Sequence, residues 1–201
     1  MGEITAAEIS NEAEILLEIR VLGEFAVLRN REHVALPTSR KTRALLAYLI
    51  MMNRPQQRDH LCEMFWDVAD NPRRALRWSL WKIRRIVNSK RYSAIVTDRS
   101  SVSLHTQLIA VDFWRVEASM RDLASVETFE LEKVVRLFRG QFLDDLSLPR
   151  CPEFEAWRIS CINDVNLFKA RILRTLIARL EKNESRALPY AQALHAMYLR
   201  T

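Results

Sequence analysis

Alternation between apolar and polar residues characterises the early part of the chain. Apolar and charged residues alternate over residues 17–21, and shorter apolar runs follow at residues 25–27 and 34–36. A period of two is typical of a half-buried strand. Gly23 and the segment 29–31 are turn signals between these runs. The pattern therefore predicts three short strands, preceded by a loose acidic tail over residues 1–14.

Helical periodicity replaces this alternation after Pro37. Thr38 or Ser39 offers an N-cap for a first helix whose apolar face runs through residues 44–52. A second helix is expected after Pro55, with its apolar side over residues 61–66. Its boundary is less sharply marked, because the residues that follow the proline are glutamines rather than strong caps.

A third helix has the clearest start in the chain. Asn71 is a favoured N-cap, and Pro72 takes the first helical position, where no amide donor is needed. The helix is predicted to run to about residue 88, because apolar residues recur at spacings of four, three and four at Leu76, Leu80, Ile83 and Val87. This stripe is the buried side of an amphipathic helix, and we expect the other residues to face outward.

Two β-rich runs at residues 94–97 and 102–104 flank the turn 98–101, which predicts a hairpin.

From residue 111 the period changes to 3.6, and helices are expected over residues 112–123, 126–139, 151–182 and 185–201, with Gly140 as a helix C-cap. No strand is expected there. Only three glycines are present, which also favours a mainly α protein. The pattern predicts two domains, over residues 15–106 and 107–201. Because the chain stops inside helical periodicity, the second domain is expected to be truncated.

The net charge of +6 is unevenly distributed. Residues 41–110 contain 13 Lys and Arg against 5 Asp and Glu, whereas residues 111–201 contain 14 against 13. Clustered cations bind a polyanion well, because each neutralised phosphate releases counterions. Charge alone leaves two interpretations open, a nucleic-acid surface and an ordinary solvated basic surface.

The segment 71–91 carries eight basic residues and no acidic one. A helix that is merely soluble usually mixes both signs, whereas a helix that enters the major groove keeps groups that bind phosphate or base edges. The N-terminal half of its outward face is where a recognition helix contacts bases, so Arg74 and Arg77 are the predicted base-reading arginines. Phosphate contacts are expected from Arg73, Lys82, Arg84, Arg85, Lys90 and Arg91.

Other residues near this helix have more than one interpretation. Trp81 is predicted to contact a thymine methyl group or a sugar, but Trp78 and Trp81 also fit a role in packing against the hairpin or the second helix. Lys41 and Arg43, at the start of the first helix, are candidates for further phosphate contacts. A single basic residue is also often just solvated.

Catalytic and metal-binding patterns receive little support. The three cysteines have no CxxC spacing, and no Gly-rich phosphate loop, HExxH or GxSxG motif occurs, so neither an enzyme, a bound metal nor a cofactor is expected. Asp144 and Asp145 are expected to be solvated loop carboxylates.

The N-terminus lacks the basic region of a secretory signal, and the longest apolar run is too short for a bilayer. A cytoplasmic protein without membrane contact is expected.

The order of these motifs resembles a known family. It is carried by the segments LLEIRVLGEFAV, VALPTSRKTRALLAYLIMMNRP, LCEMFW, NPRRALRWSLWKIRRIV and TDRSSVSL, followed by VDFWRVEA and LFRGQFLDDLSLPRCPEFEAWR. Residues 15–106 are similar to the OmpR-type winged helix of the SARP regulators, the antibiotic regulatory proteins. Residues 107–182 are similar to their bacterial transcriptional activator domain, an all-α TPR-like unit. The resemblance covers about residues 15–182.

The resemblance implies a DNA-binding transcription activator. Such proteins bind direct repeats in promoter DNA as side-by-side protomers and recruit RNA polymerase through its sigma subunit. Arg74 and Arg77 match the recognition helix, and Arg99 matches the wing tip, where a phosphate or minor-groove contact is implied. Packing residues of the helical domain are implied at Phe142, Pro152, Phe154 and Trp157. The alternative is a TPR-like protein-interaction module of a larger multidomain signalling regulator, with the basic half as a solvated docking face.

Overall fold

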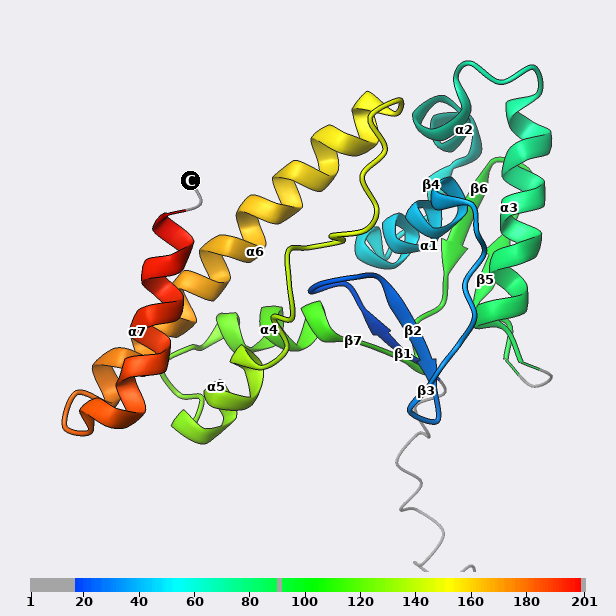
Figure 1. Cartoon of the computed structure of the whole chain (residues 1–201). Helices are drawn as coiled ribbons and strands as arrows, with labels where there is room; N and C mark the ends of the chain where they lie inside the picture. Colours follow the sequence, from blue (N-terminus) through cyan, green and yellow to red (C-terminus); the bar gives the residue numbers. More distant parts are fainter. Residues whose placement is uncertain (1–16, 90–91, 200–201) are drawn as a thin grey trace, which may run out of the picture.

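The computed structural model describes residues 17–89 and 92–199 (Figure 1). Its strands are β1 (Leu17–Arg20), β2 (Ala26–Arg29), β3 (Glu32–His33), β4 (Gln56–Gln57), β5 (Ile95–Thr97), β6 (Ser101–Leu104) and β7 (Ile109–Val111). Its helices are α1 (Arg40–Met52), α2 (Arg58–Trp66), α3 (Pro72–Val87), α4 (Asp112–Arg121), α5 (Thr128–Val135), α6 (Pro152–Arg179) and α7 (Glu184–Tyr198). The predicted tail at residues 1–14 lies outside the described residues.

The N-terminal sheet has the strand order β3-β2-β1-β7. A tight turn joins β2 to β3, because Asn30 and Arg31 both adopt positive φ, 52° and 67°, and Arg29 pairs directly with Glu32. Two-residue turns of this kind match the twist of the flanking strands. The third strand therefore lies at residues 32–33, earlier than the predicted 34–36.

Two further strands were not predicted. β7 pairs in parallel with β1, with Ile19 opposite Val111, and so ties residues beyond the predicted domain boundary to the first sheet. β4 pairs with β6 through Gln56 and Val102. Neither short segment has the alternation that marks a strand. Each is a strand only through its pairing with a partner distant in sequence, so local patterns did not predict it.

The three helices and the hairpin form a winged helix. Ser39 caps α1 by accepting a hydrogen bond from the Thr42 amide at 3.3 Å, so it is Ser39 rather than Thr38 that serves as N-cap. The side chains of Thr42 and Ser79 hydrogen-bond at 3.0 Å where α1 packs on α3. At the other end of α3, Arg29 donates to the Ile86 carbonyl at 2.8 Å and so satisfies a group that the helix itself leaves unpaired.

The C-terminal half is helical, as predicted, but two of its details differ. α5 ends at Val135, so Gly140 is not a helix cap. Instead, Gly140 lies against Gly23, where an added Cβ on Gly140 would be 3.3 Å from the Gly23 Cα. The adjacent Arg139 amide donates to the Leu22 carbonyl at 2.9 Å. The residues after α5 are thus held by the first sheet rather than by a continuing helix.

The long helix α6 connects the two halves (Figure 1). Its 28 residues extend about 42 Å, and its first turns pack against the winged helix while α7 packs along its far end. Trp157 meets Tyr48 of α1 edge-on at 4.9 Å between ring centroids, and Phe154 lies 5.3 Å from Phe65 of α2. Buried residues of both halves therefore form one continuous core.

The implied packing residues can now be assessed. Phe142 and Phe154 are almost fully buried, and Trp157 contacts both rings, so their packing role is confirmed. Pro152 is exposed at the first position of α6, so its predicted packing role is wrong. It begins the helix, where its missing amide hydrogen costs nothing. Among the described helices, none is long and apolar enough to cross a membrane.

Candidate nucleic-acid interface

The outward side of α3 presents one stripe of exposed residues at Arg74, Trp78, Trp81 and Arg85. Their spacings of four, three and four place them along one line of the helix. The opposite side contains Leu76, Leu80, Ile83 and Val87, all of them buried. The predicted third helix and its predicted inner face are both confirmed. Asn71 caps this helix through a 2.9 Å hydrogen bond from the Arg74 amide.

Trp78 and Trp81 are both exposed on the outward side of α3. Their side chains are 57% and 45% exposed, and they stack on each other with 4.7 Å between ring centroids and 8° between ring planes. The Lys82 ammonium lies 5.5 Å from the Trp78 ring centre, and the Arg85 guanidinium lies 5.0 Å from that of Trp81. The middle of the outward face therefore combines cations with a broad apolar surface.

The predicted hairpin is confirmed as β5 and β6, with a turn organised by Asp98. The Asp98 carboxylate accepts hydrogen bonds from the Ser101 amide and hydroxyl at 2.6 and 2.7 Å and from the Ser100 amide at 2.7 Å. These bonds, led by those of Ser101, lower the pKa of Asp98 to about 2. Arg99 is exposed at the tip of this turn. Its backbone is thus held in place while its side chain stays available.

A shallow depression lies between the hairpin tip and the N-terminal ends of α2 and α3. Its lining includes four arginines, Arg58, Arg73, Arg77 and Arg99. The Arg58 amide donates to the Ser100 carbonyl at 2.8 Å, which joins the start of α2 to the hairpin turn. Arg58 was missed in the sequence, because it is one isolated cation at the start of α2 and only the folded hairpin brings it beside Arg99.

Some of the expected phosphate-binding residues have partners within the chain. Arg73 pairs with Asp59 at 3.0 Å, but both side chains are more than two-thirds exposed, so this pair contributes little and can exchange for a phosphate. Arg84 donates to the Thr97 hydroxyl at 2.9 Å and bridges α3 to β5. Lys82, Arg84 and Arg85 are on the outer part of α3, whereas Lys90 and Arg91 lie outside the described residues.

Lys41 and Arg43, for which phosphate contacts were expected, have partners within the chain. The Lys41 ammonium donates to the Phe65 carbonyl at 2.6 Å, which is the end of α2. Arg43 forms a 2.9 Å ion pair with Asp145, and Asp145 also accepts the Phe25 amide at 2.8 Å. Asp145 is therefore not the solvated loop carboxylate that was expected. Lys41 therefore joins α1 to α2, and Arg43 joins α1 to the segment after α5, so neither cation is included in the proposed interface.

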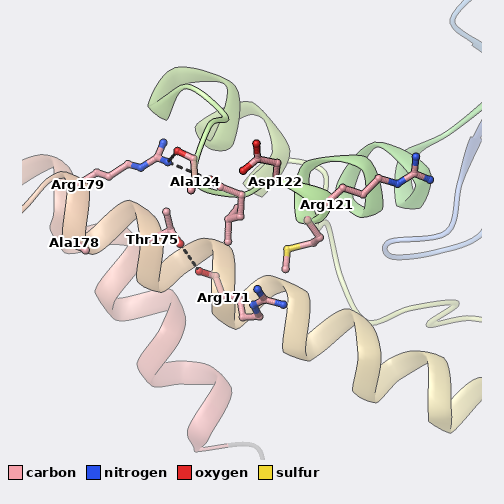
Figure 2. A pocket seen from close by; sticks show the side chains of 9 residues that line it. Arg121, Asp122, Ala124, Arg171, Thr175, Ala178 and Arg179 are labelled. Carbon is pink, nitrogen blue, oxygen red and sulfur yellow. Dashed lines mark hydrogen bonds between the residues drawn. The ribbon is translucent and has the colours of Figure 1, made fainter.

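A second hollow lies between the end of α4 and α6 (Figure 2). Arg179 donates to the Leu123 and Ala124 carbonyls at 3.1 and 2.6 Å, so its charge is used to hold the turn after α4. Figure 2 shows Arg121, Arg171 and Arg179 spread along the hollow rather than gathered at one point. This arrangement does not converge on one ligand group.

None of the three cysteine thiols is activated as a nucleophile. Burial raises the pKa of Cys161 to about 11 and also raises the pKa values of Cys62 and Cys151, so these thiols are protonated at neutral pH. All three are free. Within residues 17–89 and 92–199, no group of three His, Cys, Asp or Glu residues is placed to hold a metal ion.

Comparison with known proteins shows a likeness to a solved structure. No family model matches the sequence, and no curated protein matches it. Among solved structures, Mycobacterium tuberculosis EmbR, in complex with a low-affinity phosphopeptide, aligns with a TM-score of 0.63 at 20% identity. The alignment covers 91% of this chain. The fold is shared with EmbR.

EmbR extends well beyond this similarity, since the chain spans 54% of the EmbR chain's length. The phosphopeptide is a ligand of EmbR. The likeness to EmbR confirms the expected arrangement of a winged helix followed by a helical half, because it covers nearly all of both. At 20% sequence identity the likeness supports a shared fold, but it does not show which residues form a site.

Proposed function

We propose that this chain binds double-stranded DNA in a sequence-specific manner and regulates transcription. The observation that carries the proposal is the outward face of α3, on which basic and aromatic residues are exposed and, within Pro72–Val87, no acidic residue occurs. A helix of this kind fits the major groove of B-DNA, where arginine donates two hydrogen bonds to guanine. Arg74, Arg77 and Trp81 are the proposed base-reading residues.

The hairpin supplies the second contact. Arg99 at its tip shares a depression with Arg58, Arg73 and Arg77, so a DNA backbone that passes this edge meets cations from three elements. Further phosphate contacts are assigned to Lys82 and Arg84, beside the stripe of exposed residues on α3, and to Arg85 at the end of that stripe. Phosphate contacts of this kind set the position and register of a protein on the duplex.

The finer features follow from the resemblance to the SARP regulators. We propose that protomers bind direct repeats side by side, and that the TPR-like helical half helps to recruit RNA polymerase through its sigma subunit. The aromatic contacts that join α6 to the winged helix support such a role, because they pack the two halves into one core and so connect a partner on the helical half to the DNA.

Selection of bound duplexes from a random DNA pool tests sequence specificity. If four phosphates are neutralised, the slope of log K against log salt is about −3.6, which is a loss of about 150-fold between 50 and 200 mM salt. A selected consensus with this salt dependence supports the proposal. Failure to enrich any sequence, or an affinity that salt does not change, contradicts it and favours the protein-interaction module.

Two variants separate base reading from phosphate contact. Arg77→Ala should weaken binding by about 1–3 kcal/mol and relax selectivity at one base pair. Arg99→Ala should weaken binding to all sequences alike and reduce the salt slope by about one. Equal affinity of the wild type and Arg77→Ala for the selected site would exclude the base-reading role of Arg77.

A further inference from the structure

The stacked indoles of Trp78 and Trp81 form one apolar edge in the centre of a basic face. Tryptophan carries a large apolar surface that is normally buried, yet these two side chains are 57% and 45% exposed. Their rings are nearly parallel and in contact, so they present a continuous surface. A partner that covers this face must therefore offer apolar groups between anionic ones.

The cations around the pair favour a nucleic acid over a protein as that partner. Arg74 and Arg85 lie at the two ends of the same stripe, and Lys82 and Arg85 lie over the faces of the rings. Arg74, Arg77 and both indoles also line one surface depression. Phosphates flank the major groove on both sides, and thymine is the base that places a methyl group on its major-groove edge.

The dimensions of the pair match two base pairs. Residues three apart on a helix are separated by about 4.5 Å along its axis, whereas successive base pairs of DNA are separated by about 3.4 Å. A helix that lies obliquely along the groove therefore places the two rings over neighbouring steps. The pair has the reach to contact methyl groups on adjacent base pairs.

We propose that Trp78 and Trp81 act together as a specificity-determining unit that reads the C5 methyl groups of thymines on neighbouring base pairs. This inference rests on the proposed function and adds to it the chemical group that is recognised. Trp78 becomes part of the reading surface, and apolar contact joins the hydrogen bonds of Arg74 and Arg77. Contact with deoxyribose and docking of a protein are the outcomes that the following test distinguishes.

The experiment replaces thymines of the selected duplex one at a time by deoxyuridine and measures binding of the full chain. This replacement removes only the methyl group and leaves every phosphate and hydrogen-bonding group in place. At one or two neighbouring positions we expect binding about fourfold weaker, which is the effect of losing one buried methyl group. Replacement at other thymines should leave the affinity unchanged.

Variants identify the residues that read the methyl group. Trp78→Ala and Trp81→Ala should each reduce or abolish the preference for thymine over deoxyuridine. Arg99→Ala is the matched control, because it should weaken binding to both duplexes and keep the preference of about fourfold. Since both indoles are exposed, circular dichroism spectra like that of the wild type are expected and show that the variants fold.

Two results would overturn the inference while leaving the proposed function intact. One is a selected site without thymine, or a site in which every deoxyuridine replacement is neutral, as a sugar contact predicts. The other is a pair of tryptophan variants that keep full DNA affinity and thymine preference, as a protein-docking role predicts. Failure to select any DNA sequence would instead overturn the proposed function itself.

Discussion

The ion pair between Arg43 and Asp145 leads to a testable prediction, because the sequence indicated a phosphate contact for Arg43 and the structure pairs it with Asp145. The side chains of Arg43 and Asp145 are 21% and 26% exposed. Asp145 also accepts the Phe25 amide, and the Arg43 Nε is buried without a partner among the described atoms. Arg43→Gln, Asp145→Asn and the double variant remove the pair stepwise.

The expected loss lies between two limits. Exposed ion pairs contribute about 0–1 kcal/mol, whereas breaking a buried pair costs about 3–5 kcal/mol because one charge is left without compensation. With about three-quarters of each side chain covered, each single variant should lower the free energy of unfolding by about 2 kcal/mol. The double variant should be less destabilised than the sum, with a coupling energy of about 1–2 kcal/mol.

Urea unfolding measures these values, and DNA binding at several salt concentrations completes the test. Arg40→Gln is the matched control, since Arg40 is exposed on the same helix and its loss should change stability by less than about 0.5 kcal/mol. Arg43→Gln should leave the salt slope unchanged. If it lowers the slope by about one and leaves stability unaffected, Arg43 binds phosphate and our structural assignment is wrong.

Three other variants test local features. Asn71→Ala should lower stability by about 1 kcal/mol in urea unfolding, because α3 loses its N-cap; no loss would mean that the cap is dispensable. Gly23→Ala should lower it by about 1–3 kcal/mol, since Gly23 has a φ of 139° and an added Cβ would lie 3.2 Å from the Arg139 Cβ, and an unchanged midpoint would contradict this strain. For the hairpin turn, the pKa of Asp98 should be near 2 by NMR titration and should rise towards 3.8 in Ser101→Ala. Because this pKa is lowered on folding, its contribution to stability is present above pH 3.8 and is lost as the pH falls towards 2. A pKa that stays near 2 in Ser101→Ala would show that the Ser101 hydroxyl does not cause the shift, since the variant keeps the backbone amide at this position.

Local signals in the sequence were sufficient to predict the elements whose stabilising contacts lie within a few residues along the chain. α3 was predicted from its cap, its proline and its apolar stripe, all of which act within a few residues. The hairpin was likewise predicted from two β-rich runs around a polar turn. The same local reading placed Arg74, Arg77 and the two tryptophans on the outer side of α3, because a helix with one buried stripe leaves the opposite side exposed.

Longer-range features depended on the tertiary structure. The parallel pairing of β7 with β1, the packing of Gly140 on Gly23 and the meeting of Arg58 with Arg99 join residues far apart in sequence, and no local pattern encodes such contacts.

The charges show the same division. The sequence by itself determined that the basic residues cluster around α3, because composition and helical period are properties of the chain. Only the folded structure decided which of those cations are free to meet a ligand. Arg43 and Lys41 are held by an aspartate and a carbonyl from other segments, whereas Arg77 and Arg99 remain at the surface, because burial and pairing depend on which distant groups folding brings within hydrogen-bonding distance.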